Sequence, residues 1–208
     1  SEMNALIFDF DGTIVDTETP AHRSTVEIWD AHGVELDFEW WISGLGTDRS
    51  HSWVDELERR TGRRLDHEAL LTERRRIKDE ITDQQPVLAG VVELIAAARA
   101  RGVPLAIGSS SEHEWVDRHL DRVDLSRHFD HVVCRDAVGG RAKPAPDVYH
   151  RAVELLGVSA ADVVVVEDSL NGLRAAVAAG LRCVVVPNLL TTHLEFPGAT
   201  LRLGSLDD

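Results

Sequence analysis

The 208-residue sequence has few of the features that mark membrane or secreted proteins. It has no apolar run near the ~20 residues that a membrane-spanning helix needs. The apolar start Leu6–Phe8 is interrupted at once by Asp9 and Asp11, unlike a signal peptide. Its two cysteines, Cys134 and Cys183, lie in apolar stretches without metal-type spacing. We therefore expect buried thiols, a reducing compartment, a cytoplasmic location and no membrane partner.

Positive charge is also scarce. The chain has 22 basic against 36 acidic residues, which gives a net charge of −14. Nucleic-acid binding depends on clustered Lys and Arg, so this balance argues against a nucleic-acid partner. The arginine clusters between residues 59 and 76 are interrupted by acids. They are interpreted as a solvated helix face, the alternative being a local positive patch that guides an anionic substrate.

What the sequence does contain is a repeated strand–helix pattern. Apolar, β-branched runs predict strands at residues 5–10, 104–108, 131–134, 163–166 and 182–186. The run of four valines does not alternate with polar residues, which is typical of a parallel strand buried on both faces. Helical patterns lie between the runs, at residues 91–101, 112–122, 147–156 and 172–179. This alternation predicts an α/β fold with a doubly wound, Rossmann-like parallel sheet.

Residues 18–85 break the alternation. They contain helical patterns at 19–32, 48–61 and 66–83, and they hold four of the five tryptophans. A helical insertion directly after the first strand is difficult to place inside a sheet. We therefore expect a separate helical cap at 18–85 and a catalytic core formed by 1–17 and 86–208, in a chain that is a monomer. The polar tail after Pro187 is expected to add one short strand.

Two acids follow the first predicted strand. On an extended strand Asp9 and Asp11 point to the same side, roughly 7 Å apart. Gly12 permits backbone angles that curl the chain after them. Carboxylates at the end of an apolar strand are costly unless a cation or hydrogen bonds satisfy them. The other interpretation is a turn whose aspartates cap the next segment of the chain.

Hydroxyl groups follow the predicted strand at 104–108. Ser109 ends that strand ahead of a helix, where hydroxyl and free N–H groups suit a phosphate oxygen. The alternative is an ordinary helix start, in which Ser110 or Ser111 forms a capping box with Glu114.

Two further features follow later strands. Lys143 precedes Pro144, which restricts its backbone, so its ammonium is presented to a phosphate or a carboxylate. The alternative is a surface lysine in a turn. Glu167 and Asp168 end the strand of valines, and such hard oxygen ligands suit Mg²⁺. Here the alternative is a helix N-cap formed by Asp168 or Ser169.

These features are predicted to meet. Ligands of open α/β sheets bind beyond the carboxyl ends of the strands. Three of the four features end a predicted strand, and Lys143 follows a fourth. Acids for a cation and donors for an anion are therefore expected in one crevice.

In this order and spacing the motifs resemble the haloacid dehalogenase-like hydrolase superfamily, in the branch with a helical cap after the first motif. The resemblance covers essentially the whole chain and is closest to β-phosphoglucomutase-like and sugar-phosphate phosphatase-like members. The motifs that carry it are Asp9-Phe-Asp-Gly-Thr13, Ser109, Lys143-Pro144 and Glu167-Asp-Ser-Leu-Asn-Gly172.

The resemblance implies a Mg²⁺-dependent phosphatase for a small phosphorylated metabolite. Asp9 attacks phosphorus and forms an aspartyl-phosphate, and Asp11 protonates the leaving alcohol and then activates water. Mg²⁺ is held by Asp9, the Asp11 carbonyl and Asp168, with Glu167 nearby. A cation is needed because an anionic nucleophile approaches an anionic phosphate. The substrate-binding residues that it implies are Gly12, Thr13, Ser109, Ser110 and Lys143, with Arg49 in a loop that resembles the cap's specificity loop.

For each alternative function, one feature of the sequence bears on the choice. A phosphosugar mutase carries a cap histidine where spacing places Ala21, with His22 one position later, and Thr13 also favours hydrolysis. Haloacid dehalogenation has no use for the acids Asp11 and Asp168. A receiver-like signalling domain lacks a helical insertion after its first strand, and its acceptor aspartate lies on a later strand. A catalytically silent binding protein is expected to have lost one of the four sites.

Overall fold

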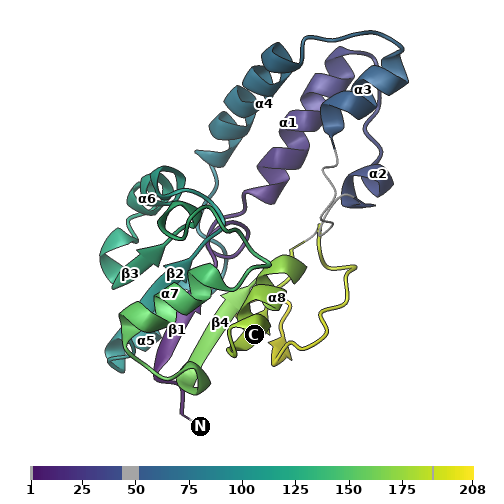
Figure 1. Ribbon diagram of the computed structural model, residues 1–208. Helices are drawn as coiled ribbons and strands as arrows, with labels where there is room; N and C mark the ends of the chain where they lie inside the picture. The colour runs from purple at the N-terminus through teal and green to yellow at the C-terminus, as the bar shows by residue number, and fades with distance from the viewer. Residues whose placement is uncertain (1, 44–51, 189) are drawn as a thin grey trace. The chain divides into compact units, whose positions relative to one another are not determined.

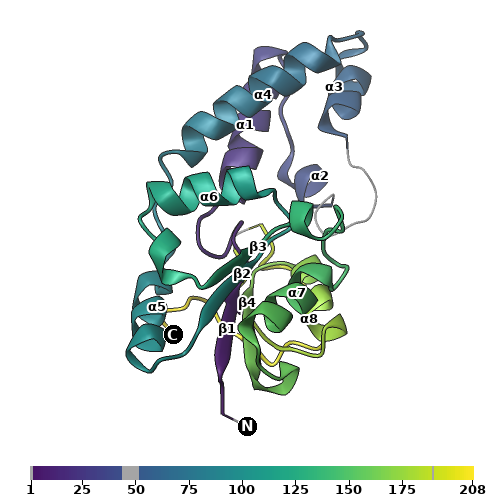
Figure 2. The ribbon, with the colours of Figure 1, turned by 60° about the vertical axis from the view of Figure 1, so that its left-hand side comes forward.

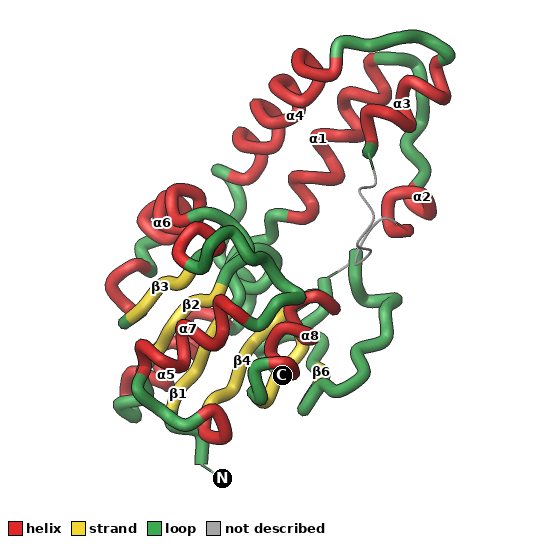
Figure 3. Tube along the Cα trace, in the orientation of Figure 1, coloured by secondary structure: helices red, strands yellow, loops and turns green. Residues whose placement is uncertain are grey.

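A computed structural model describes residues 2–43, 52–188 and 190–208. The chain divides into two compact units, Ser1–Val15 with Pro86–Asp208, and Asp16–Gln85. Among the described residues, every strand belongs to the first unit, and the second unit consists of helices and loops (Figure 3).

The first unit is built on a parallel sheet with the strand order β3-β2-β1-β4-β5-β6 (Figure 1). β1 lies between β2 and β4, with Phe8 aligned to Ile107 on one side and to Val166 on the other. The sheet confirms the predicted doubly wound α/β fold. Its strands are β1 Ala5–Phe8, β2 Leu105–Gly108, β3 His131–Val133, β4 Val163–Glu167, β5 Arg182–Val185 and β6 Leu201–Arg202.

Helices cover both faces of this sheet (Figure 2). Alternate side chains of β1 point to opposite faces, as a strand requires. Leu6 and Phe8 pack in the cluster with α5 and α6, whereas Ala5 and Ile7 pack in the cluster with α7 and α8. Burial on both faces explains the unbroken apolar strand sequences. The helices are α5 Val91–Ala100, α6 His113–Arg122, α7 Asp147–Leu156 and α8 Leu170–Ala178.

Two boundaries differ from the prediction in ways that shape the site. β1 ends at Phe8 and not at residue 10. The N–H of Asp9 still donates to Val166, but the carbonyl of Phe10 accepts from Thr13 and Ile14, so the chain turns directly after Asp9.

The alternative interpretation of the serines before α6, a capping box with Glu114, is wrong. The N-cap is Glu112, without a side-chain cap bond, and the N–H of His113 donates to Asp136 at 3.2 Å. An acid that follows β3 therefore satisfies the start of the helix, which leaves the serine hydroxyls for other contacts.

The second unit packs its helices around a core of its own. Trp29 and Leu57 are fully buried there with Trp53 and Ile77, so these tryptophans form the core of the unit. The helices are α1 Glu18–Ala31, α2 Phe38–Ser43, α3 Trp53–Thr61 and α4 His67–Thr82.

Two helices of this unit depart from the prediction. Within the described residues α3 begins at Trp53, because Ser52 is extended and its hydroxyl accepts from the N–H of Asp55. The predicted start at residue 48 lies outside the described residues. The helix α2 was not predicted. The carboxylate of Asp37 accepts from the N–H of Trp40 in its first turn, which is a capping signal that the tryptophan-rich sequence obscured.

The cysteines are buried free thiols, as predicted. Burial raises the pKa of Cys134 to about 12. Among the described helices, none is both long and apolar enough to cross a membrane.

Candidate active site

The carboxyl ends of three neighbouring strands bring the predicted site residues together within the first unit. Asp9 follows β1, Ser109 follows β2, and Glu167 and Asp168 end β4. All four are buried. Lys143 reaches them from the loop before α7, and its peptide bond to Pro144 is cis.

Asp9 is held by two donors. The ammonium of Lys143 lies 2.8 Å from Oδ1, and the hydroxyl of Thr13 donates to Oδ2 at 3.1 Å. Both donors are side-chain groups and neither is a backbone N–H of the turn, so these two bonds do not cap it.

Lys143 is a buried cation, so its interpretation as a surface lysine is wrong. Its side chain is 5% exposed. Besides Asp9, the ammonium donates to the carbonyl of Gly108 at 2.7 Å and to Glu167 Oε1 at 2.6 Å. Burial alone lowers the pKa of Lys143, but the carboxylates of Asp9 and Glu167 outweigh it and hold the pKa above its usual range.

Glu167 is enclosed by four donors. Oε1 accepts from Lys143 and from the hydroxyl of Tyr149, and Oε2 lies 3.2 Å from the N–H of Asp168 and 3.5 Å from the hydroxyl of Ser169. Burial and repulsion from Asp9 raise the pKa of Glu167, although Lys143 opposes the shift. A Cβ at Gly172 would lie 1.9 Å from this carboxyl group, so any larger residue there would force the carboxyl group to shift.

Asp168 completes a buried acidic cluster with Asp9 and Glu167. One ligand oxygen from each of the three lies within 4.8 Å of the others. The Asn188 amide donates to Asp168 Oδ2 at 3.2 Å. A Cβ at Gly12, which has a φ of +83°, would lie 2.0 Å from the same oxygen. Glycine is therefore needed in the loop after β1 both for its backbone angles and for this close approach.

Ser169, and not Asp168, caps the following helix. Its hydroxyl accepts from the N–H of Gly172 at 3.0 Å. The capping interpretation is thus correct for the serine, while the aspartate carboxylate remains part of the acidic cluster.

The cluster fits a hard divalent cation. Lys143 pairs with Asp9 and Glu167, and its single charge balances only one of three buried carboxylates. Uncompensated buried charge is costly, and carboxylate oxygens are the ligands that divalent cations such as Mg²⁺ prefer.

Asp11 is held apart from this cluster by groups from the β2 side. Its Oδ1 accepts from the indole N–H of Trp115 at 2.8 Å, and its Oδ2 accepts from the hydroxyl of Ser111 at 2.6 Å. The neighbouring serines have other partners: Ser109 accepts from the N–H of Ser111, and Ser110 accepts from the N–H of Lys143, both at 3.0 Å.

A second group of possible metal ligands, His113, Cys134 and Asp136, is explained by an ion pair. Nδ1 of His113 lies 2.8 Å from Asp136, and Nε2 lies 2.9 Å from the carbonyl of Val132. Burial alone lowers the pKa of His113, but these two acceptors outweigh it and raise the pKa. Both ring nitrogens thus act as donors and offer no lone pair to a metal.

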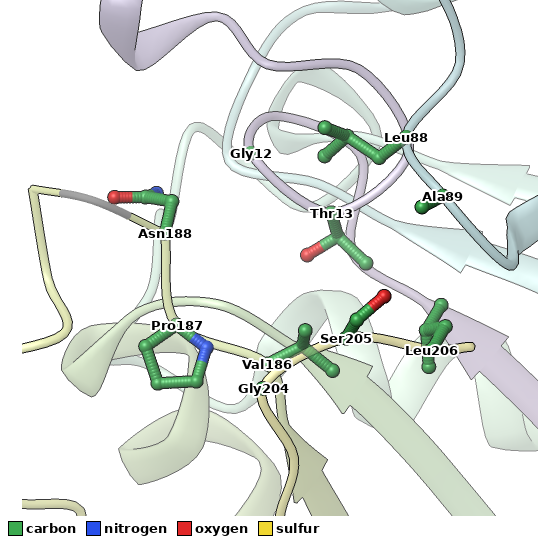
Figure 4. A pocket seen from close by; sticks show the side chains of 10 residues that line it. All are labelled: Gly12, Thr13, Leu88, Ala89, Val186, Pro187, Asn188, Gly204, Ser205 and Leu206. Carbon is green, nitrogen blue, oxygen red and sulfur yellow. The ribbon is translucent and has the colours of Figure 1, made fainter. Parts of the chain in front are cut away.

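A pocket of about 140 Å³ opens beside the acidic cluster (Figure 4). Thr13 and Asn188 line one part of it, and both also contact Asp168. The remaining wall is largely apolar, with Leu88, Val186 and Leu206 among its residues. The pocket lies next to the acids and does not include them.

Arg49, which was predicted to bind substrate, lies outside the described residues. Four residues that contact the site were not predicted as part of it: Ser111, Trp115, Tyr149 and Asn188. Asn188 follows the end of β5, so the rule that indicated Asp9 and Asp168 would also have indicated it. Ser111 was predicted only as a helix cap. Tyr149 and Trp115 reach the site from helices, where no strand end marks them.

Comparison with known proteins identifies the class to which this arrangement belongs. The sequence model of the haloacid dehalogenase-like hydrolases matches residues 3–180. The chain therefore belongs to the haloacid dehalogenase-like hydrolase family.

Particular relatives narrow the class. YhcW of Bacillus subtilis, which is named as a phosphatase, is 37% identical over 98% of this chain and 92% of its own length. The fructose-1-phosphate phosphatase YqaB of Escherichia coli is 33% identical over 87% of this chain and 95% of its own length. The crystal structure of CbbY from Rhodobacter sphaeroides in complex with phosphate covers 99% of this chain and 96% of its own, with 30% identity and a TM-score of 0.76.

The chain is accordingly a phosphatase that acts on small phosphate esters. This assignment removes the receiver-like signalling domain and the silent binding protein from the alternatives. Hydrolases of this family generally use a divalent metal, and the buried acidic cluster is the place in the first unit that suits one.

Proposed function

We propose that the protein hydrolyses the phosphate ester of a small sugar phosphate, with Mg²⁺ as cofactor, through an aspartyl-phosphate on Asp9. The observation that carries the proposal is the environment of Asp9: a buried carboxylate held from either side by Lys143 and Thr13, next to two more acids. The helical unit is proposed to serve as the cap of this enzyme.

Asp9 is the proposed nucleophile. A fixed carboxylate meets phosphorus without a loss of rotational freedom at the moment of reaction. Lys143 reduces the repulsion between Asp9 and an anionic phosphate and, with Ser109, is proposed to hold phosphate oxygens. Gly12, Thr13 and Ser110 stay proposed as the neighbouring substrate-binding positions.

Asp9, Asp168 and the carbonyl of Asp11 are the proposed Mg²⁺ ligands. When bound, Mg²⁺ supplies positive charge that stabilises the transferring phosphoryl group. Glu167 was expected near the metal, but a carboxylate has about four acceptor positions and four donors already surround this one. We therefore assign Glu167 the task of anchoring Lys143.

Asp11 is the proposed general acid and base. It stands two residues after the nucleophile, and its carboxylate takes no part in the acidic cluster. It is therefore available to carry a proton to the leaving alcohol and to take one from water.

The sugar-phosphate class is supported by the relatives. YqaB is named for fructose 1-phosphate, and CbbY has been crystallised in complex with xylulose 1,5-bisphosphate. A phosphosugar mutase remains the rival, because a structure described as a β-phosphoglucomutase, from Thermotoga maritima, is similar at a TM-score of 0.81 with 25% identity.

Packing in the second unit supports hydrolysis over the mutase reaction. The ring of His22 lies against Phe38 at 5.8 Å and Trp41 at 5.3 Å between centroids. Its Nε2 is buried and has no hydrogen-bond partner among the residues that the structure describes. This packing among aromatic side chains supports a structural role for His22 within the second unit.

A phosphatase screen over sugar phosphates tests the proposal, with Mg²⁺ or with EDTA. We expect phosphate release with Mg²⁺, loss of release with EDTA, and no turnover by Asp9→Asn. Asp207→Asn is the matched control, since this carboxylate is exposed near the C-terminus. Activity that survives EDTA, or an active Asp9→Asn enzyme, would overturn the mechanism. If glucose 1-phosphate is isomerised faster than phosphate is released, the protein is a phosphosugar mutase.

A further inference from the structure

The carboxylate of Asp11 is bound at both oxygens by uncharged donors. The indole N–H of Trp115 lies 2.8 Å from Oδ1 and the hydroxyl of Ser111 lies 2.6 Å from Oδ2. Ser111 lies in the loop that joins β2 to α6, and Trp115 lies in the first turn of α6. Asp11 is therefore held from the β2 side, whereas the acidic cluster involves β4.

The two donors are themselves fixed. The N–H of Ser111 donates to the Ser109 hydroxyl at 3.0 Å, and its carbonyl accepts from the N–H of Arg135 at 3.1 Å. The Trp115 ring packs against the fully buried ring of His119, with centroids 4.4 Å apart. Because both donors are anchored, they impose one orientation on the carboxylate between them.

We propose that Trp115 and Ser111 are positioning residues that orient the Asp11 carboxylate for proton transfer; the inference rests on the proposed function of the site. If a divalent cation is bound by Asp9 and Asp168, an unrestrained Asp11 carboxylate would be drawn to it. Two donors occupy two of the carboxylate's roughly four acceptor positions, so positions remain for a proton. The two neutral donors orient the group, whose charge has to change in each half of the reaction.

Trp115 and Ser111 form a clamp on the Asp11 carboxylate, and the proposed reaction moves a proton through that carboxylate in each half. In the first half an Asp9 oxygen bonds to phosphorus, the bond to the leaving oxygen breaks, and the proton of Asp11 goes to that oxygen. In the second half Asp11 takes a proton from water as the water oxygen bonds to phosphorus. The bond between Asp9 and phosphorus then breaks, and its electron pair returns to the Asp9 carboxylate.

Esters whose leaving groups differ in their need for a proton test whether the clamp of Trp115 and Ser111 positions Asp11 for proton transfer. Two esters are compared by kcat/KM, which reports the steps up to release of the leaving group: the sugar phosphate that the screen ranks first, and p-nitrophenyl phosphate. An alkoxide leaves poorly without a proton, whereas a nitrophenolate leaves well. We expect Trp115→Phe and Ser111→Ala each to lower kcat/KM for the sugar ester about tenfold, the size of a hydrogen bond to a charged group. The value for p-nitrophenyl phosphate should change little.

Control variants separate this inference from the function on which it rests. Asp11→Asn should lower kcat/KM for the sugar ester by roughly 10²–10⁴-fold. As in the two clamp variants, the value for p-nitrophenyl phosphate should change much less. Ser111→Thr should restore activity because it keeps the hydroxyl. Ser126→Ala removes a hydroxyl that bonds Asp121, away from the site, and should leave both esters unaffected.

Two results would overturn the positioning role. One is an equal loss on both esters in Trp115→Phe and Ser111→Ala. The other is an undiminished sugar-ester rate in both variants while Asp11→Asn shows the selective loss. If Asp11→Asn shows no selectivity, the acid–base assignment of Asp11 fails as well, and Asp9→Asn still tests the nucleophile separately. Thermal melting of each variant reports whether it folds.

Discussion

The two sides of Asp9 are built differently. On the β4 side, buried carboxylates are paired with a buried ammonium, and Glu167 alone has four donors around it. On the β2 side, a single partly exposed carboxylate, Asp11, is bound by a hydroxyl and an indole.

The difference teaches what each side is for. Groups that must keep their charge are held by opposite charge in a desolvated place, where electrostatic interactions are strong. A group that must gain and lose a proton is oriented by neutral donors at a less buried place. The β4 side should therefore respond to substitution mainly with lost stability, and the β2 side mainly with lost proton transfer.

The largest expected effect comes from breaking the ion pairs of the β4 side. Lys143→Met leaves Asp9 and Glu167 without their shared cation. Removal of one partner from a buried pair costs about 3–5 kcal/mol, measured as a change in the free energy of unfolding by denaturant titration. Ser111→Ala, on the β2 side, should cost only about 1 kcal/mol. Equal losses in these two variants would contradict the comparison.

A second variant removes the pairing by displacing Glu167. In Gly172→Ala the new Cβ would lie 1.9 Å from the carboxyl group of Glu167. We expect about 1–3 kcal/mol of lost stability from overpacking, together with a large fall in kcat, because Lys143 loses its anchor. Gly204→Ala is the control for the change in stability alone, since that glycine is exposed and an added Cβ would lie 3.2 Å from the Asp208 side chain. Normal kcat in Gly172→Ala would show that Glu167 does not position Lys143.

The smallest expected effect is a pH dependence on the β2 side. His113, the first residue of α6, pairs with Asp136, and its pKa is raised in the folded protein. The pair stabilises the fold while His113 is charged. Its contribution is therefore full below the unfolded pKa of about 6.5 and is lost as pH rises through the higher folded value. The gain is small because both side chains of the pair are exposed enough for solvent to screen their charges.

Asp136→Asn measures this contribution. The difference in melting temperature between wild type and variant should be largest near pH 6 and should shrink at alkaline pH. The same difference in melting temperature at every pH would mean that Asp136 does not stabilise the charged form of His113.

The sequence predicted the part of the site that lies at strand ends. Asp9, Ser109 and Asp168 each follow an apolar run, and the geometry of parallel sheets requires such positions to converge. Lys143 was found because its motif is sequence-local. Gly12 was also predictable, because the chain must turn after the acids.

The remainder depends on tertiary packing that no local pattern encodes. Tyr149 reaches Glu167 from α7, where helical periodicity marks it only as a buried side chain. Trp115 likewise appears in sequence as one residue of a helix, and only the fold brings it to Asp11, 104 residues away. The early end of β1 depends on hydrogen bonds of Phe10 that β-propensity does not reveal.

The most direct test of the central claim is to trap the phosphorylated enzyme. Asp11→Asn should slow the hydrolysis of an aspartyl-phosphate, because water activation is lost. The variant is mixed with Mg²⁺ and p-nitrophenyl phosphate, whose leaving group does not need a proton from residue 11. It is then quenched in acid, and its peptides are analysed by mass spectrometry. The account predicts one phosphoryl group on the peptide that contains Asp9, and none in Asp9→Asn. Turnover without a phosphorylated Asp9, or a phosphoryl group on another residue, would contradict it.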